Sequence, residues 1–146
     1  MLMKAIQPIR TTVWAFLCCV AASVYADNNQ QGIPDSSRWS PMYKACNEKT
    51  ATMPELVKMK QLLNSRQLSP TDAAEVKSGV EEVETMFHNY CVCVAQKADE
   101  AFQLSGYNIS PVEITLLSAA FRFDQLYPDQ QVRELFGMSI LPCMGL

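Results

Sequence analysis

Two cysteines one residue apart, Cys91 and Cys93, lie inside a long stretch whose apolar residues repeat with a helical period. From Val76 to Phe102 these residues recur at steps of three and four, which is typical of one buried helical face, and Cys91 lies on that face. Residues two apart on a helix point about 200° apart, at about 100° per residue, so Cys93 leaves from nearly the opposite side. The two sulfur atoms therefore cannot bind one metal ion together or bond to each other within a regular helix. Each cysteine should reach a different partner.

The N-terminus predicts that these cysteines are oxidised. Lys4 and Arg10 precede an apolar run at 13–22, and small residues follow up to Ala26, which is the pattern of a secretory signal peptide over residues 1–26. The apolar run is about ten to twelve residues long, whereas a membrane-spanning helix needs about twenty. We therefore expect cleavage after Ala26, export to the periplasmic space or the extracellular medium, and no stable membrane insertion afterwards.

Cysteine counting then predicts two disulfides. Of the 6 cysteines, Cys18 and Cys19 leave with the signal peptide, and four remain: Cys46, Cys91, Cys93 and Cys143. An even number in an exported chain favours two disulfides over a metal site or a redox centre. Because a bond between the two helical cysteines is excluded, two pairings stay open, 46–91 with 93–143 or 46–93 with 91–143.

The chain after the predicted signal peptide is expected to form a single all-α domain. Ser-Pro pairs begin at Ser40, Ser69 and Ser110, and in each pair the serine can cap a helix whose first position the proline fills. No window shows the sustained period-two alternation of a half-buried strand. We therefore predict a small irregular bundle of four or five helices over residues 40–146, held by two disulfides, with a polar and flexible leader over residues 27–39.

The sequence also predicts helix lengths and burial. The central helix can run from Pro70 to Leu104, and at about 1.5 Å per residue it would be about 50 Å long, so we expect a bend or break near Gly79. The helix after the third Ser-Pro pair is apolar nearly all round and should be the most buried. A short last helix should begin at Pro128 and end at Gly137.

The charge balance argues against two classes of partner. The whole chain has a formal charge of −3, and removing residues 1–26 leaves ten basic and 15 acidic residues, a charge of −5. Nucleic acids and anionic membrane surfaces are bound through concentrated positive patches, and the chain has no cluster of Lys and Arg. We expect neither partner.

Few residues suggest catalysis or metal binding. His88 is the only histidine, and a nucleophilic pair with Cys91 would require a free thiolate, which two disulfides would remove. A zinc site would compete with both bridges and lacks the usual cysteine spacing. Glu81, Glu82 and Glu84 are expected to form a solvated acidic side of the central helix. No catalytic, cofactor-binding or metal site is predicted.

The first functional hypothesis is an exported, non-catalytic protein-binding module, such as an inhibitor, an immunity-type protein or an accessory subunit of an envelope assembly. A possible partner surface is the acidic side of the central helix, which comprises Glu81, Glu82, Glu84, Asp99 and Glu100. A second hypothesis is a carrier of a lipid or another apolar ligand in a cavity between helices, and a third is a small hydrolase. The general plan is similar in size and composition to several bacterial periplasmic helical proteins, including acid-stress chaperones and effector-immunity proteins.

Overall fold

The computed structural model describes residues 37–65 and 67–145, which fold into helices joined by short loops, with no strand in those two segments. The elements are α2 (Ser40–Ala51), α3 (Pro54–Asn64), α4 (Pro70–Ser105), α5 (Pro111–Arg122), α6 (Gln130–Ile140) and the short 3-10 helix η1 (Leu141–Met144). The predicted all-α bundle of four or five helices with two disulfides is therefore confirmed. The predicted signal peptide and residues 27–36 of the leader lie outside the described residues.

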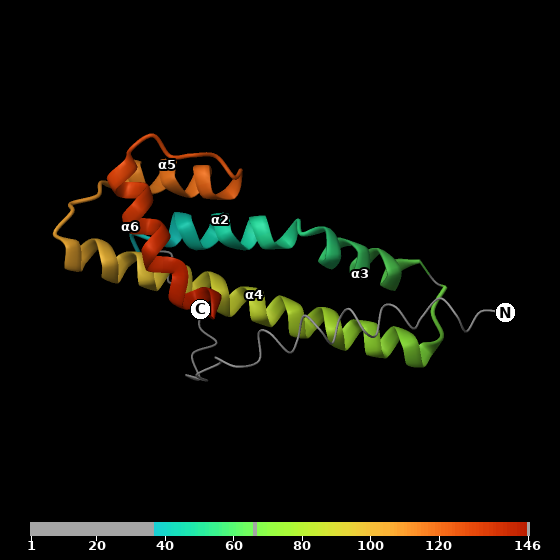
Figure 1. Ribbon diagram of the computed structural model, residues 1–146. Helices are drawn as coiled ribbons and strands as arrows, with labels where there is room; N and C mark the ends of the chain where they lie inside the picture. The colour runs from blue at the N-terminus through green and yellow to red at the C-terminus, as the bar shows by residue number, and fades with distance from the viewer. Residues whose placement is uncertain (1–36, 66, 146) are drawn as a thin grey trace.

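The helices form a layered body with a two-helix arm (Figure 1). In the body, α2 lies between α5 and α4, and α6 crosses the C-terminal half of α4. In the arm, α3 packs against the N-terminal half of α4, and both extend beyond the other helices. Within the arm, the buried side chains are those of Leu56 on α3 and Val80 on α4. The body therefore contains nearly all of the hydrophobic core.

The core begins one residue before α2, at Trp39. This indole is fully buried and packs on Phe102 of α4, with ring centroids 5.2 Å apart. Trp39 is also the residue that precedes the first turn of α2, whereas Ser40 is buried inside that turn and makes no side-chain cap. The predictions that Trp39 belongs to a flexible leader and that Ser40 caps the helix are therefore wrong, because one large buried side chain fixes the start of the domain.

The central helix α4 is continuous over 36 residues, so the expected break near Gly79 is wrong. A Cβ atom added to Gly79 would lie 3.4 Å from Cε of Met59 on α3, so this glycine lies where α3 packs against α4. A single glycine in a helix interior costs about 1 kcal/mol relative to alanine, which neighbouring turns can tolerate. The predicted C-terminus is confirmed, since Gly106 ends α4 with a left-handed φ of 71°.

The two C-terminal helices differ from prediction in burial and in length. Helix α5 is not buried all round, because Ile114 and Leu117 face the core while Val112 and Leu116 are exposed. Helix α6 starts after Asp129, whose side chain accepts a hydrogen bond from the backbone N–H of Val132, and it continues through Gly137 to Ile140. The expected start at Pro128 and end at Gly137 are therefore wrong. The aspartate supplies the N-terminal cap, and packing on α4 carries the helix past the glycine.

The structure selects one of the two pairings that the sequence left open. Cys46 bonds to Cys91 and Cys93 bonds to Cys143, at sequence separations of 45 and 50. The first bridge joins α2 to α4, and the second joins α4 to η1. The chain-entropy model gives each bridge a stabilisation of about 4 kcal/mol. The two bridges leave α4 on opposite sides, as the spacing of Cys91 and Cys93 on a helix predicts.

Serine caps fix the starts of α4 and α5, as predicted. The Ser69 side chain accepts a hydrogen bond from the backbone N–H of Asp72, 3.2 Å away. At α5, the Ser110 side chain accepts from the backbone N–H of Glu113, and the Glu113 carboxylate accepts from the backbone N–H of Ser110 at 2.8 Å. This second hydrogen bond lowers the pKa of Glu113, and the Tyr107 hydroxyl contributes by donating to the same carboxylate.

We predict that Glu113→Gln lowers the free energy of unfolding at neutral pH and that the difference from wild type narrows in acid. A carboxyl with a lower pKa in the folded than in the unfolded state contributes stability above its unfolded pKa, and this is lost as pH falls through the folded value. The narrowing should therefore begin below about pH 4.5. Urea unfolding of the variant and of wild type, from neutral pH to below about pH 4.5, measures this difference in free energy. The control is Glu75→Gln, at an exposed position of α4. If the difference in free energy of unfolding between Glu113→Gln and wild type stays constant or widens in acid, the carboxylate of Glu113 does not stabilise the cap.

Candidate functional site

An open polar groove lies where the end of α2 and the start of α3 meet α4. Its volume is about 560 Å³, and its lining includes Asn47, Thr50, Leu56, Lys60, Glu84 and His88. Lys60 and Glu84 pair across the groove at 2.5 Å. The lining combines three apolar side chains, Ala51, Leu56 and Phe87, with amide, hydroxyl and charged groups. A groove of this kind can accept polar groups but does not enclose an apolar ligand.

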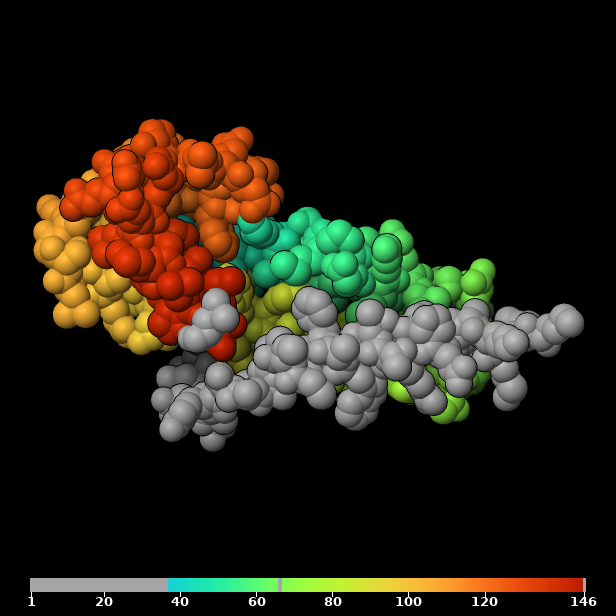
Figure 2. Space-filling view, viewed as in Figure 1, coloured from blue at the N-terminus to red at the C-terminus, as the bar shows by residue number. Residues whose placement is uncertain are grey.

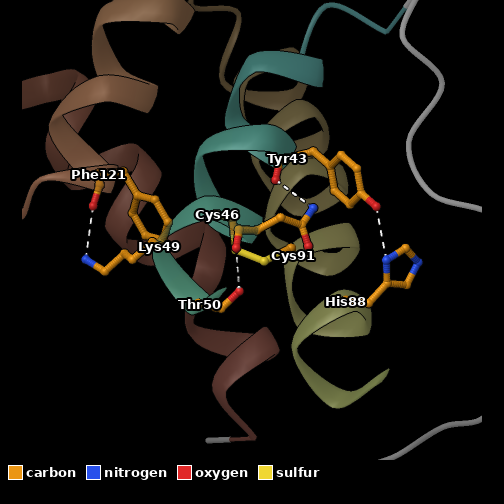
Figure 3. Close-up of a disulfide and its surroundings, with 8 residues drawn as sticks. Tyr43, Cys46, Lys49, Thr50, His88, Cys91 and Phe121 are labelled. Carbon is orange, nitrogen blue, oxygen red and sulfur yellow. Dashed lines mark hydrogen bonds between the residues drawn. A yellow bond between two sulfur atoms is a disulfide. The ribbon is translucent and has the colours of Figure 1, made fainter. Parts of the chain in front are cut away.

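His88 lies at the edge of this polar groove and contacts α2 (Figure 3). Its Nδ1 atom is 3.0 Å from the Tyr43 hydroxyl, and the two rings meet edge to face with centroids 5.8 Å apart. Its Nε2 atom is buried and has no hydrogen-bond partner in the described part of the chain. The histidine is therefore partly buried, and its observed role is to tie α4 to α2.

The disulfide one turn further along α4 leaves Cys91 without a free thiol. Cys91 bonds to Cys46 and both residues are fully buried, so the Cys91 sulfur carries no free thiolate beside His88. Within residues 37–65 and 67–145, no group of three or more His, Cys, Asp or Glu side chains is placed to hold a metal ion. The contacts at His88 and Cys91 therefore join α2 to α4.

Lys49 makes the matching connection on the other side of α2. Its Nζ donates to the backbone carbonyl of Phe121 at 3.0 Å, pairs with Asp124, and lies 5.0 Å from the Phe121 ring centroid. Carbonyl groups at a helix C-terminus carry partial negative charge, so the ammonium group stabilises the end of α5. Helix α2 is thus held to α4 by Cys46 and Tyr43 and to α5 by Lys49.

The predicted acidic side of α4 is mostly neutralised by basic partners. Glu84 pairs with Lys60, and the other close pairs are Glu100 with Lys97 at 2.7 Å, Asp99 with Arg38 at 2.8 Å and Glu81 with Lys77 at 3.8 Å. Glu82 is exposed. Glu81 and Asp99 share one side of the helix because they are eighteen residues apart, whereas Glu82 and Glu100 lie about 100° around the axis. Four of these five carboxylates therefore have a basic partner within 4 Å, and the five are spread over more than one line along α4.

A different surface is strongly apolar. Val112, Leu116 and Phe123 on α5 are 67%, 56% and 60% exposed, and Ala119 lies between them on the same side. We call these four residues the α5 stripe. Their spacings of four, three and four place them on one line along the helix, about 180° from Ile114. Helix α5 lies on the opposite side of α2 from α4 (Figures 1 and 2), and the high exposure of these side chains shows that the line contacts solvent.

The sequence reasoning missed both Tyr43 and the α5 stripe. Tyr43 carries no motif, and only the tertiary pairing of α2 with α4 brings it to His88. The α5 stripe was interpreted as part of a helix buried all round. The sequence does contain a signal for the α5 stripe, namely its regular spacing of apolar residues. Two apolar lines on opposite sides of one helix predict two separate contacts.

A carrier of an apolar ligand would need a cavity lined by aromatic and aliphatic side chains, but most such side chains of the C-terminal helices and loops pack into the core. Phe102, Ile109, Tyr127 and Phe136 are buried in one cluster, whereas Leu104 is 88% exposed. A second groove, of about 480 Å³, runs beside Phe121 and Tyr127, and it too is open to solvent. Neither groove encloses a ligand-sized apolar space.

The two disulfides indicate an oxidising compartment. Of the helices in the described segments, none combines the length and the apolarity that a bilayer crossing demands. Comparison with known proteins gave no match to a family model, a curated protein or a solved structure.

We predict that Tyr43→Phe lowers the free energy of unfolding by about 1 kcal/mol, since it leaves both ring nitrogens of the partly buried His88 unpaired. Chemical denaturation with the disulfides intact measures the change. Tyr90→Phe is the matched control, because the Tyr90 hydroxyl makes no hydrogen bond within the described residues. Its effect should stay within about 0.5 kcal/mol of zero. Equal effects of the two substitutions would contradict a structural role for the Tyr43–His88 contact.

Proposed function

We propose that this chain is an exported, non-catalytic protein-binding module that acts in the periplasmic space or outside the cell. The observation that carries the proposal is the α5 stripe, in which Val112, Leu116 and Phe123 are more than half exposed in one line. Large apolar side chains gathered on the surface of a folded domain commonly mark an interaction site, since their contact with water is unfavourable.

The scaffold beneath the α5 stripe supports this role because it is fixed at both ends. Glu113 and Ser110 close the first turn of α5, and Lys49 binds the backbone at its end. Arg122 in the last turn pairs with Glu48 of α2 at 2.5 Å and lies over the Phe123 ring. A surface that is rigid before binding loses little conformational entropy when a partner docks.

The spacing of the α5 stripe favours a helical partner. Residues at steps of four and three form a seam of the kind that one helix presents to another. Charged residues near the seam are already engaged, Glu113 in the cap and Arg122 with Glu48. The complementary surface is therefore an amphipathic helix that contributes an apolar line of its own.

We predict that a photo-crosslinking amino acid in place of Leu116 captures a discrete polypeptide in the native host. The matched control is the same amino acid in place of Gln131, which is exposed on α6 away from the α5 stripe. Mass spectrometry of the adduct identifies what was captured, and circular dichroism checks that both variants fold. Adducts from Leu116 alone would support the proposal.

Other outcomes of the crosslinking experiment count against the proposal. Equal capture from Leu116 and Gln131 would mean that the contact is non-specific. An adduct of lipid mass from Leu116 would replace the binding module with the apolar-ligand carrier. A dimer of this chain alone would make the α5 stripe a self-association surface.

We also predict that association with the captured partner depends only weakly on salt. Burial of apolar surface is insensitive to ionic screening, whereas steering by exposed charges is screened over about 10 Å at 0.1 M salt. Stopped-flow association rates at several salt concentrations measure the dependence. A rate that falls steeply with salt would reject the α5 stripe and direct attention to Glu81, Glu82, Glu84, Asp99 and Glu100 on α4.

A further inference from the structure

The two disulfides differ in their access to solvent. Cys46 and Cys91 are both 0% exposed and lie between α2 and α4. Cys93 and Cys143 are both partly exposed and join α4 to η1. Disulfide exchange requires an external thiolate to reach one of the bonded sulfur atoms, so its rate depends on access. Only the second bridge can be reached while the fold is intact.

Apart from the disulfide and the packing of Cys143 itself against the core, the segment that carries Cys143 has few attachments within the described residues. Helix η1 contains no buried residue, and Leu141 and Met144 on either side of the cysteine are 46% and 56% exposed. The preceding helix α6 is anchored independently, because Val132 is fully buried and Phe136 is 6% exposed. Opening the second bridge would therefore release η1 while α6 stays packed on α4.

We propose that the Cys93–Cys143 bridge is a thiol–disulfide exchange site for an external dithiol, of the kind that oxidoreductases of oxidising compartments carry. Both cysteines are partly exposed, and the entry point is Sγ of Cys143 because the residues around it in η1, Leu141, Pro142 and Met144, are all exposed. The Cys46–Cys91 bridge does not take part. This site is separate from the α5 stripe and does not depend on the binding proposal.

The exchange is a balanced two-electron reaction. One thiolate of the dithiol attacks Sγ of Cys143 and forms a mixed disulfide, while the Cys93–Cys143 bond breaks and Cys93 leaves as a thiolate that takes a proton from water. The second thiol of the reagent, as its thiolate, then attacks the reagent's first sulfur atom, which is bonded to Sγ of Cys143 in the mixed disulfide. Cys143 is released as a thiolate, which is also protonated. The dithiol is oxidised to a disulfide, and Cys93 and Cys143 are reduced to thiols.

Dithiothreitol is the probe that tests this site on the disulfide-bonded protein from its exported compartment. Samples are quenched with acid at intervals and alkylated, and the remaining disulfides are then reduced and labelled with a second alkylating reagent. Digestion with trypsin should then release residues 78–97 as one peptide. Because this peptide carries both Cys91 and Cys93, fragment-ion sequencing must assign the modified position. We expect alkylation of Cys93 and Cys143 at least about tenfold faster than alkylation of Cys46 and Cys91, as for local rather than global opening.

Two further measurements separate exchange from unfolding. Circular dichroism after the fast phase should retain the helical signal, and hydrogen exchange should speed up in residues 141–145 but not in α6. A Cys93→Ser, Cys143→Ser double variant, which keeps only the buried bridge, should lack the fast phase. Equal rates at the two bridges, faster opening of Cys46–Cys91, or loss of helical signal during the fast phase would overturn the proposal.

Discussion

The Cys46–Cys91 bridge fixes α2 against α4, and the position of the remaining body follows from this pair. Helix α2 is only 12 residues long, too short to be stable in isolation, so it depends on its contacts with α4 and α5. The bridge crosses the helix interface and is supported by the Tyr43–His88 contact one turn away on α4. With α2 held in place, Lys49 can bind the end of α5 and Trp39 can pack on Phe102. The central layer of the bundle thus rests on one covalent link between residues distant in sequence.

The position of α5 on the outside of α2 explains its double character. One apolar line, which includes Ile114 and Leu117, completes the core. The opposite line, the α5 stripe, has no covering element within residues 37–65 and 67–145. Complete burial of a large apolar side chain contributes about 1.5–3 kcal/mol, and Val112, Leu116 and Phe123 still have more than half of that surface left to bury, which favours association. The same helix therefore serves the fold on one side and offers a binding surface on the other.

Charge plays a smaller part in this protein than its composition suggests. The acidic residues of α4 mostly meet lysines or arginines, as Glu84 meets Lys60 and Asp99 meets Arg38. Exposed pairs of this kind are worth about 0–1 kcal/mol each, so they adjust local geometry more than stability. Counting charges along the chain predicted an acidic face. The tertiary structure places basic side chains of α3 and of the segment before α2 against it.

The sequence by itself determined the helical class, the start of α4 at Ser69, the start of α5 at Ser110 and the end of α4 at Gly106, because these depend on backbone geometry and neighbouring residues. It also excluded a bond between Cys91 and Cys93, since side-chain direction on a helix is set by sequence spacing. Only the tertiary structure decided that Cys91 meets Cys46, that Trp39 belongs to the core and that one side of α5 stays exposed. These features depend on which helices become neighbours. An apolar residue at a given position is buried or exposed according to what packs against it, and no local pattern specifies that.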